Sequence, residues 1–280
     1  MASEDVARVA AIDDRVARLR AATEGLSTAQ RDMTELARMR RALIQDLHDE
    51  GWSYTQIAEA AGLSRGRIHQ VRHHGPSPEG AFFGRGPLTV ATPLKREERA
   101  ARPVVAAEDV ATSQRLGELA RSLDHAVEFE QIAIDGRIDL DRDGLIVICG
   151  PRISKDVAGV LAADPALQFE ELASGWALRD RRTGRLYKSG QDEEDPQPYD
   201  IAYLGRLERP DGKGRLIVFT GIHPPGTLGV VQLLTNDLSR VHRAAGEGAF
   251  SVLLHIDYDK PSHEPTSVQM VTPIYKHADD

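Results

Sequence analysis

Residues 52–74, WSYTQIAEAAGLSRGRIHQVRHH, constrain the fold of this 280-residue chain more than any other segment. The spacing of the apolar residues predicts a helix over 54–61 and a second helix a few residues later. Gly62 permits the chain to turn with positive φ, and Ser64 offers a hydroxyl that caps the second helix. The positions expected to face inward are Ile57, Ala58, Ala61, Leu63, Ile68 and Val71.

Over about residues 36–74, this pattern resembles the helix-turn-helix family, specifically the region-four type of sigma factors and its relatives among bacterial regulators. The resemblance implies that the second helix enters the major groove of double-stranded DNA. Arg65 and Arg67 would each offer two donors to guanine, and Gln70 would bridge adenine. The expected DNA contacts are Ser53, Tyr54, Thr55, Ser64, Arg65, Arg67, His69, Gln70, Arg72 and His73. The alternative is a protein-interaction module with a solvated basic face.

The charge distribution agrees with DNA as a partner, although the net charge does not. The formal net charge is −8. No acidic residue stands between Glu59 and Glu79, where three arginines and three histidines are found. A local cationic face therefore remains within an acidic protein. The chain lacks the aromatic, basic promoter-melting helices of a sigma factor, which favours a transcription regulator.

Two helices are expected before this segment, over 3–23 and from Ser27 to just before Gly51. Each carries an apolar stripe, which indicates either packing within the domain or the seam of a coiled-coil dimer. We expect a homodimer, because operators are commonly palindromic.

Residues 76–105 are rich in proline and glycine and have no sustained period, so we interpret them as a linker or arm. The predicted domains are then a helical DNA-binding domain over 1–75 and an α/β domain over 106–280. The latter should open with a helix over 107–128, which either belongs to that domain or pairs with its copy in a dimer.

Beyond Leu140 short apolar runs alternate with turn residues. LIVIC (145–149) and RLIVFTGI (215–222) are typical of strands buried on both faces, and each is followed by glycine and a helical pattern. WALRDRRTGRLY is typical of a hairpin that turns at Thr183 and Gly184. The expected fold class is therefore α+β and multidomain, with a mostly parallel sheet and a β-hairpin in the second domain.

Two glycine-containing loops, CGPRISKD and GIHPPGTLG, follow the two buried strands. Loops at the carboxyl ends of parallel strands bind ligands, and helix N-termini there favour phosphate. They resemble those of nucleotide-binding Rossmann-like domains of the lysine-decarboxylase-like and second-messenger-sensing families, which implies a nucleotide-like or phosphorylated effector. The glutamate that those enzymes carry after Gly-Thr is absent here. The expected ligand-binding residues are Gly150, Pro151, Arg152, Ser154, Lys155, Asp200, Tyr203, Gly221, His223, Gly226 and Thr227. Ordinary strand-to-helix turns are the alternative.

Other functional classes find less support. There is no apolar run long enough to span a membrane and no secretory signal at the start, so we expect a cytoplasmic protein. The single cysteine, Cys149, is expected in a buried strand without a redox role. No metal site, cofactor or catalytic residue is expected. Two alternatives to a ligand-sensing regulator stay open: a nucleotide-processing enzyme tethered to a DNA-binding module, and a protein-docking regulator without a small ligand.

Overall fold

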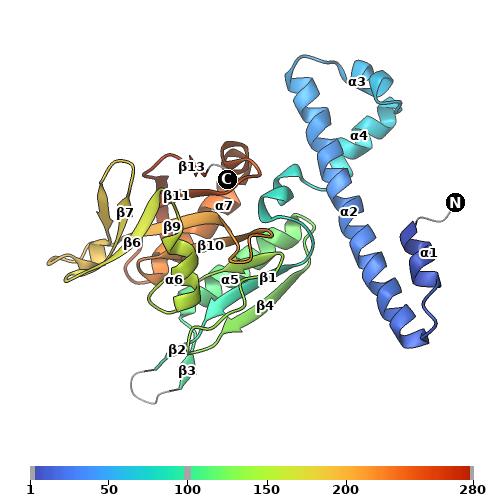
Figure 1. Cartoon of the computed structure of the whole chain (residues 1–280). Helices are drawn as coiled ribbons and strands as arrows, with labels where there is room; N and C mark the ends of the chain where they lie inside the picture. The colour runs from blue at the N-terminus through green and yellow to red at the C-terminus, as the bar shows by residue number, and fades with distance from the viewer. Residues whose placement is uncertain (1–3, 98–101, 278–280) are drawn as a thin grey trace. The chain divides into compact units, whose positions relative to one another are not determined.

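The computed structural model describes residues 4–97 and 102–277 (Figure 1). The chain divides into two compact units, Met1–Ala81 and Phe82–Asp280. Helices alone make up the described part of the first unit, and the second combines helices with a large sheet. The expected α+β class is therefore confirmed. No helix in the described ranges is both long and apolar enough to cross a lipid bilayer.

The N-terminal unit is built around one long helix. Its elements are α1 Glu4–Ala10, α2 Arg15–Asp49, α3 Tyr54–Ala60 and α4 Arg65–His74. The 3₁₀ helix η1 Pro78–Phe83 contains the boundary between the units, after Ala81. The expected break before Ser27 is wrong, because α2 runs through it without interruption. The boundary between helices lies instead before Arg15. The carboxylate of Asp14 accepts the N–H of Ala17 at 2.6 Å and caps α2. Gly25 lies inside this helix, although glycine there costs about 1 kcal/mol relative to alanine.

Helices α3 and α4 pack on α2, and the caps and the turn between α3 and α4 agree with the sequence pattern. Ser53 and Gln56 form a capping box at the start of α3. Gly62 has a φ of +64°, and the Oγ of Ser64 accepts the N–H of Arg67 at the start of α4. The buried core of this unit consists of Ile44, Ile57, Ala58, Ile68 and Val71.

The second unit is organised around an eight-stranded mixed sheet. Its strand order is β12-β11-β9-β10-β5-β1-β4, and β13 also pairs with β11. The strands are β1 Leu88–Pro93, β4 Val127–Ile132, β5 Leu145–Val147, β9 Tyr199–Glu208, β10 Arg215–Gly221, β11 Phe250–Tyr258, β12 Pro265–Met270 and β13 Tyr275–Lys276. A two-stranded ribbon joins β2 Lys95–Arg96 to β3 Pro103–Val104.

The expected parallel core is one half of this sheet. Strands β4, β1, β5 and β10 pair in parallel, so the two β-branched runs lie side by side as predicted. From β10 onward every pairing is antiparallel, which the sequence analysis did not anticipate. Strand β11 points the same way as the parallel strands, and β9, β12 and β13 point the opposite way.

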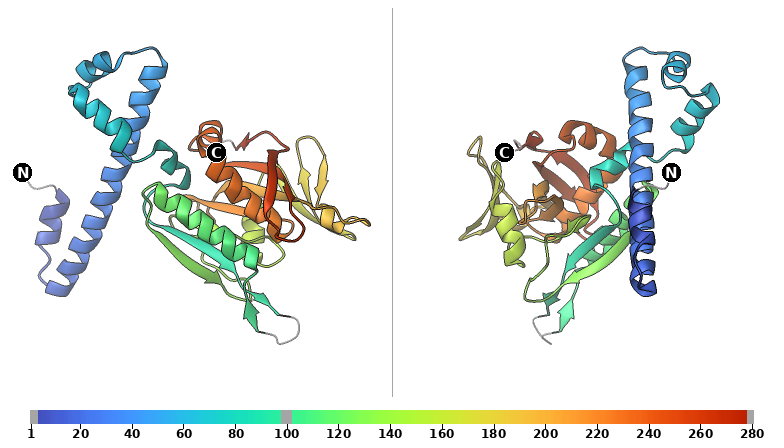
Figure 2. Two further views of the ribbon diagram at one scale, coloured as in Figure 1. Left: turned by 180° about the vertical axis from the view of Figure 1, so that it is seen from behind. Right: turned by 45° about the vertical axis from the view of Figure 1, so that its right-hand side comes forward.

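The two faces of the sheet are covered differently (Figure 2). Helices α5 Ala107–Ser122 and α7 Pro224–Ala245 pack against each other and share one hydrophobic core with one face. Helix α6 Lys155–Ala162 packs on the other face, where a second core also includes the small sheet. This sheet consists of β6 Leu167–Leu172, β7 Gly175–Asp180 and β8 Leu186–Lys188. Strands β7 and β8 form the predicted hairpin, and a short 3₁₀ helix, η2 Gly190–Asp192, follows it.

The predicted linker is wrong over most of its length. Residues 76–105 contain β1, which lies between β5 and β4 inside the sheet. Leu88, Val90 and Ala91 are fully buried, and Phe82 and Phe83 belong to the core. Glycine and proline on both sides of this short strand concealed it. The predicted helix over 107–128 is also too long, because α5 ends at Ser122 and β4 begins at Val127.

Candidate functional site

Helix α4 presents a continuous polar and cationic surface. It buries only Ile68 and Val71, three residues apart, so the remainder of the helix faces outward. Its exposed side chains are those of Arg65, Arg67, His69, Gln70, His73 and His74. The Nη1 of Arg67 donates to the Oε1 of Gln70 at 3.2 Å, so these two side chains lie together at the centre of the surface.

The C-terminal part of α4 is tied to the start of α3. The guanidinium of Arg72 lies 4.0 Å from the centre of the Tyr54 ring, and this ring also stacks on His48. Arg72 is therefore held beside Ser53 and the exposed Thr55 at the beginning of α3. Such an arrangement suits contacts with phosphate.

His73 extends the cationic surface in a pH-dependent way. Its ring lies 4.3 Å from that of His69. The pKa of His73 is lowered from 6.5. The largest cause is repulsion by His69, followed by desolvation and by repulsion from Arg72. At neutral pH its ring is consequently a neutral hydrogen-bonding group.

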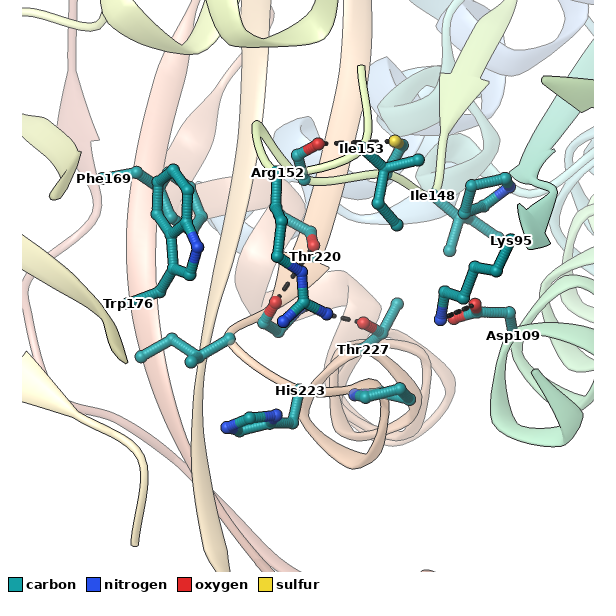
Figure 3. Close-up of a pocket in the computed structure, with 16 residues that line it drawn as sticks. Lys95, Asp109, Ile148, Arg152, Ile153, Phe169, Trp176, Thr220, His223 and Thr227 are labelled. Atoms are coloured by element: carbon teal, nitrogen blue, oxygen red, sulfur yellow. Dashed lines mark hydrogen bonds and ion pairs between the residues drawn. The ribbon is translucent and has the colours of Figure 1, made fainter. Parts of the chain in front are cut away.

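In the second unit, a pocket opens at the carboxyl ends of the parallel strands (Figure 3). It encloses about 480 Å³ of empty space, part of which is open to solvent. Phe169 and Trp176 lie on one side, and the ion pair between Lys95 and Asp109, 2.9 Å apart, lies on the other. Five of the eleven predicted ligand residues line this pocket: Gly150, Arg152, Gly221, His223 and Thr227.

The rest of the first glycine loop does not line the pocket. The hydroxyl of Ser154 is fully buried, donates to the carbonyl of Gly136 and accepts the N–H of Val157 as the cap of α6. Pro151 and the exposed Lys155 also lie outside the pocket lining. In this loop Arg152 alone brings a charged side chain to the pocket.

The N-terminus of α7 is already occupied by a carboxylate of the protein. The Oδ2 of Asp200 accepts the N–H of His223 at 2.8 Å and that of Gly226 at 3.2 Å. Pro224 and Pro225, the first two residues of the helix, have no N–H to offer. A phosphate therefore finds no free amides here, and Asp200 and Gly226 build the helix end without lining the pocket. This corrects the expected amide cradle.

Close backbone approach explains the glycines of this loop. A Cβ on Gly226 would lie 2.2 Å from the Oδ2 of Asp200, and one on Gly221 would lie 2.1 Å from the carbonyl oxygen of His223. Thr227 holds the turn together by accepting the N–H of Gly221 at 2.8 Å. The sequence signal taken for ligand binding is thus mainly a signal for helix capping.

Tyr203, a predicted ligand residue, has a structural role, and Cys149 is buried as the sequence analysis expected. Tyr203 is buried and donates its hydroxyl to the Oδ2 of Asp164 at 2.7 Å, so it does not line the pocket. Burial raises the pKa of Cys149 to about 12, and its thiol stays protonated. Cys149 contributes to the pocket wall as a small apolar residue.

Among the lining residues that the sequence analysis missed, four form the two opposite sides of the pocket. Lys95 lies just after β1 in the presumed linker, and its partner Asp109 lies in the first turn of α5. Burial raises the pKa of Asp109, and the nearby Lys95 opposes this change. Phe169 and Trp176 come from the small sheet, and their rings meet edge to face. The only sequence signal for them was the hairpin that contains Trp176.

Comparison of this chain with protein-family models, curated proteins and solved structures finds no match. The geometry of the α4 surface and of the pocket is therefore the basis for assigning a function.

Proposed function

We propose that this protein is a DNA-binding transcription regulator in which α4 enters the major groove. The observation that carries the proposal is the outward surface of α4, where polar and cationic side chains occupy every exposed position except Gly66. The starts of α3 and α4 are both capped by serine. Arg65 and Arg67 near its N-terminus are suited to guanine edges, and Gln70 to adenine. Arg72, with Ser53, Tyr54 and Thr55, is suited to the phosphate backbone.

The first test uses the full chain and a DNA pool with a random central segment. Repeated selection of bound DNA should yield a defined sequence, whose affinity is then measured by fluorescence anisotropy. Each arginine that contacts a base contributes about 1–3 kcal/mol of discrimination. Arg65→Ala with Arg67→Ala should therefore weaken binding to the selected sequence by about 5- to 150-fold per residue.

The matched control is Arg15→Ala with Arg20→Ala, which removes two exposed arginines of α2. It has the same change in net charge and should retain most of the affinity. Equal affinity of the wild type and the Arg65/Arg67 variant for the selected sequence would refute the DNA-binding assignment.

The proposal also assigns a small anionic effector to the pocket of the second unit. Among the described residues Arg152 has no ion-pair partner, whereas Lys95 is neutralised by Asp109. The pocket therefore offers one unpaired cation between an aromatic side and a polar side, which fits a flat ring with a phosphate or carboxylate. To regulate, the ligand must bind the two functional states of the protein with different free energies.

Calorimetric titration with a panel of nucleotides and phosphorylated metabolites tests this assignment. A ligand that binds the wild type should lose at least tenfold in affinity in Arg152→Ala and in Trp176→Ala. Arg240→Ala, an exposed arginine of α7, is the control and should bind normally. Equal binding by Arg152→Ala would contradict the assignment of this pocket.

An enzymatic role for the pocket is the second candidate. The Nε2 of His223 lies 3.0 Å from the Oδ1 of Asp192, and a histidine paired with a carboxylate can move protons. Product formation from the same nucleotide panel, abolished by His223→Ala, would favour this role over sensing.

A further inference from the structure

The long helix α2 carries an apolar face whose large side chains the other described residues leave mostly exposed, while Ala22 and Arg40 on the same face are half-buried. Its five large apolar side chains on this face are 60% to 70% exposed: Leu19, Leu26, Met33, Leu36 and Leu43. Leucines and methionines exposed in a row along a helix mark an interaction surface.

The spacing of this face follows a heptad. Leu19, Leu26, Met33 and Arg40 are seven residues apart and form the a positions. The d positions are Ala22, Ala29, Leu36 and Leu43. Seven of these eight positions are apolar, over four consecutive heptads, which is the length at which a coiled-coil seam becomes a specific signal. The seam is about 36 Å long at 1.5 Å per residue.

We propose that this seam, Leu19 to Leu43, joins two copies of the chain as an antiparallel two-stranded coiled coil. A second copy is the occupant that the heptad favours, because the same repeat then supplies both surfaces.

Side-chain size and charge favour the antiparallel orientation. If Leu19 faces Leu43 of the second copy, Leu26 faces Leu36, Met33 faces Ala29, and Arg40 faces Ala22. The long Arg40 then meets a small alanine. In a parallel dimer at equal register, Arg40 would meet the Arg40 of the second copy inside the seam.

The charges that flank the seam agree with this orientation. Arg18 and Asp46 both occupy g positions, which face each other between antiparallel helices. In the proposed register Arg18 of each copy lies opposite Asp46 of the other, giving two attractive pairs. Asp32 lies opposite Asp32 of the second copy, and the two carboxylates repel each other. Asp32→Asn should therefore tighten the dimer slightly.

The proposed dimer has a consequence for DNA, which rests on the proposed function. Ile44 anchors α3 and α4 on α2. The centre of the dimer falls at Arg31, so the two Ile44 residues lie about 39 Å apart along the seam. One turn of DNA separates half-sites by roughly 34–36 Å. The selected DNA should accordingly contain two inverted half-sites about one helical turn apart.

Light scattering of the full chain during gel filtration tests the dimer without DNA. A negative result therefore refutes the dimer without refuting the DNA-binding assignment. The expected mass is twice the 30.7 kDa of one chain. Leu26→Glu with Leu36→Glu should give the mass of one chain. Arg20→Glu with Ser27→Glu, on the opposite exposed side of α2, should leave the dimer intact. Circular dichroism confirms that each variant retains its helices.

Disulfide trapping tests the orientation with milder changes, and the buried native cysteine does not interfere. Under copper–phenanthroline oxidation, Leu26→Cys alone and Leu36→Cys alone should not cross-link, because each faces a leucine of the second copy. An equilibrated mixture of the two should give a cross-linked heterodimer. A single-chain mass for the wild type, which would leave the seam to the C-terminal unit of the same chain, overturns the proposal. A dimer that survives Leu26→Glu with Leu36→Glu, or self-cross-linking of the single variants, also overturns it.

Discussion

At the scale of single residues, Asp200 is the most informative side chain of the second unit. It is fully buried, its Oδ2 accepts two backbone N–H groups, and its Oδ1 has no hydrogen-bond partner. Burial, only partly opposed by the hydrogen bond from the His223 backbone, raises the pKa of Asp200 from 3.8 to about 6. The folded chain therefore holds this proton more tightly than the unfolded chain does.

A pH-dependent stability follows from this carboxyl. Its contribution to stability is full below about pH 4 and is lost as the pH rises through about 6. Asp200→Asn keeps an oxygen acceptor for the two amides and removes the titration. The unfolding free energy of the wild type relative to this variant should fall between pH 4 and pH 7 by up to about 3 kcal/mol. Urea unfolding at several pH values measures the difference, and parallel profiles for the two proteins would contradict it.

At the scale of elements, the turn between α3 and α4 depends on the backbone conformation of one glycine. Gly62 has a φ of +64°, and a Cβ there would meet no atom within 4 Å. Any cost of a side chain at this position is therefore backbone strain alone. Gly66, in the first turn of α4, has an ordinary helical backbone and room for a Cβ, with the Oγ of Ser64 at 3.9 Å.

The two glycines form a matched pair of substitutions. Gly62→Ala should destabilise the N-terminal unit by about 1–2 kcal/mol because it forces alanine into the left-handed region. Gly66→Ala should stabilise it by up to about 1 kcal/mol, because alanine is the better helix former. Thermal unfolding followed by circular dichroism compares them. Equal shifts in the same direction would show that backbone conformation does not decide the outcome.

The elements also show which parts of the fold were predictable. The caps and turn of α3 and α4 are local, so Ser64, Gly62 and the inward pair Ile68 and Val71 could be identified from their spacing. Strand β1 could not, because its burial depends on β4 and β5, which are distant in sequence. Similarly, Ser27 looks like a helix start, but only the competition with Asp14 decides where α2 begins.

The candidate pocket was predictable only in part, for the same reason. Loops after adjacent parallel strands must meet at one edge of the sheet, so Gly150 and Gly221 could be brought together. The two sides of the pocket could not be predicted, because Lys95 and Trp176 come from segments whose positions depend on long-range pairing. Nothing near His223 in the sequence indicates that the carboxylate of Asp200 accepts the free N–H groups at the start of α7.

At the scale of the whole molecule, charge is distributed unequally between the units. Residues 1–81 hold 11 arginines and 12 acidic residues, so seven of the eight net negative charges belong to residues 82–280. The candidate DNA-binding unit is therefore nearly neutral, and α4 carries three of its arginines and no acidic residue.

This imbalance predicts how the C-terminal unit affects DNA affinity. A fragment of residues 1–81 should bind nonspecific DNA more tightly than the full chain at low salt, because the acidic unit repels phosphate. The difference should shrink as ionic strength approaches about 0.15 M, where the screening length is about 8 Å. Anisotropy titrations of both proteins over a salt series measure it. Tighter binding by the full chain at low salt would show that residues 82–280 contribute contacts of their own.

The capping of α7 by Asp200 also bears on the order of folding. The first turn of α7 has no side-chain cap within its own segment and depends on a carboxylate from β9, 23 residues before His223. We therefore expect this turn to become stable only after β9 has paired with β10. Nucleation of α7 should start near its C-terminal end. Its N-terminal turn should form last, in the same kinetic step as the pairing of β9 with β10.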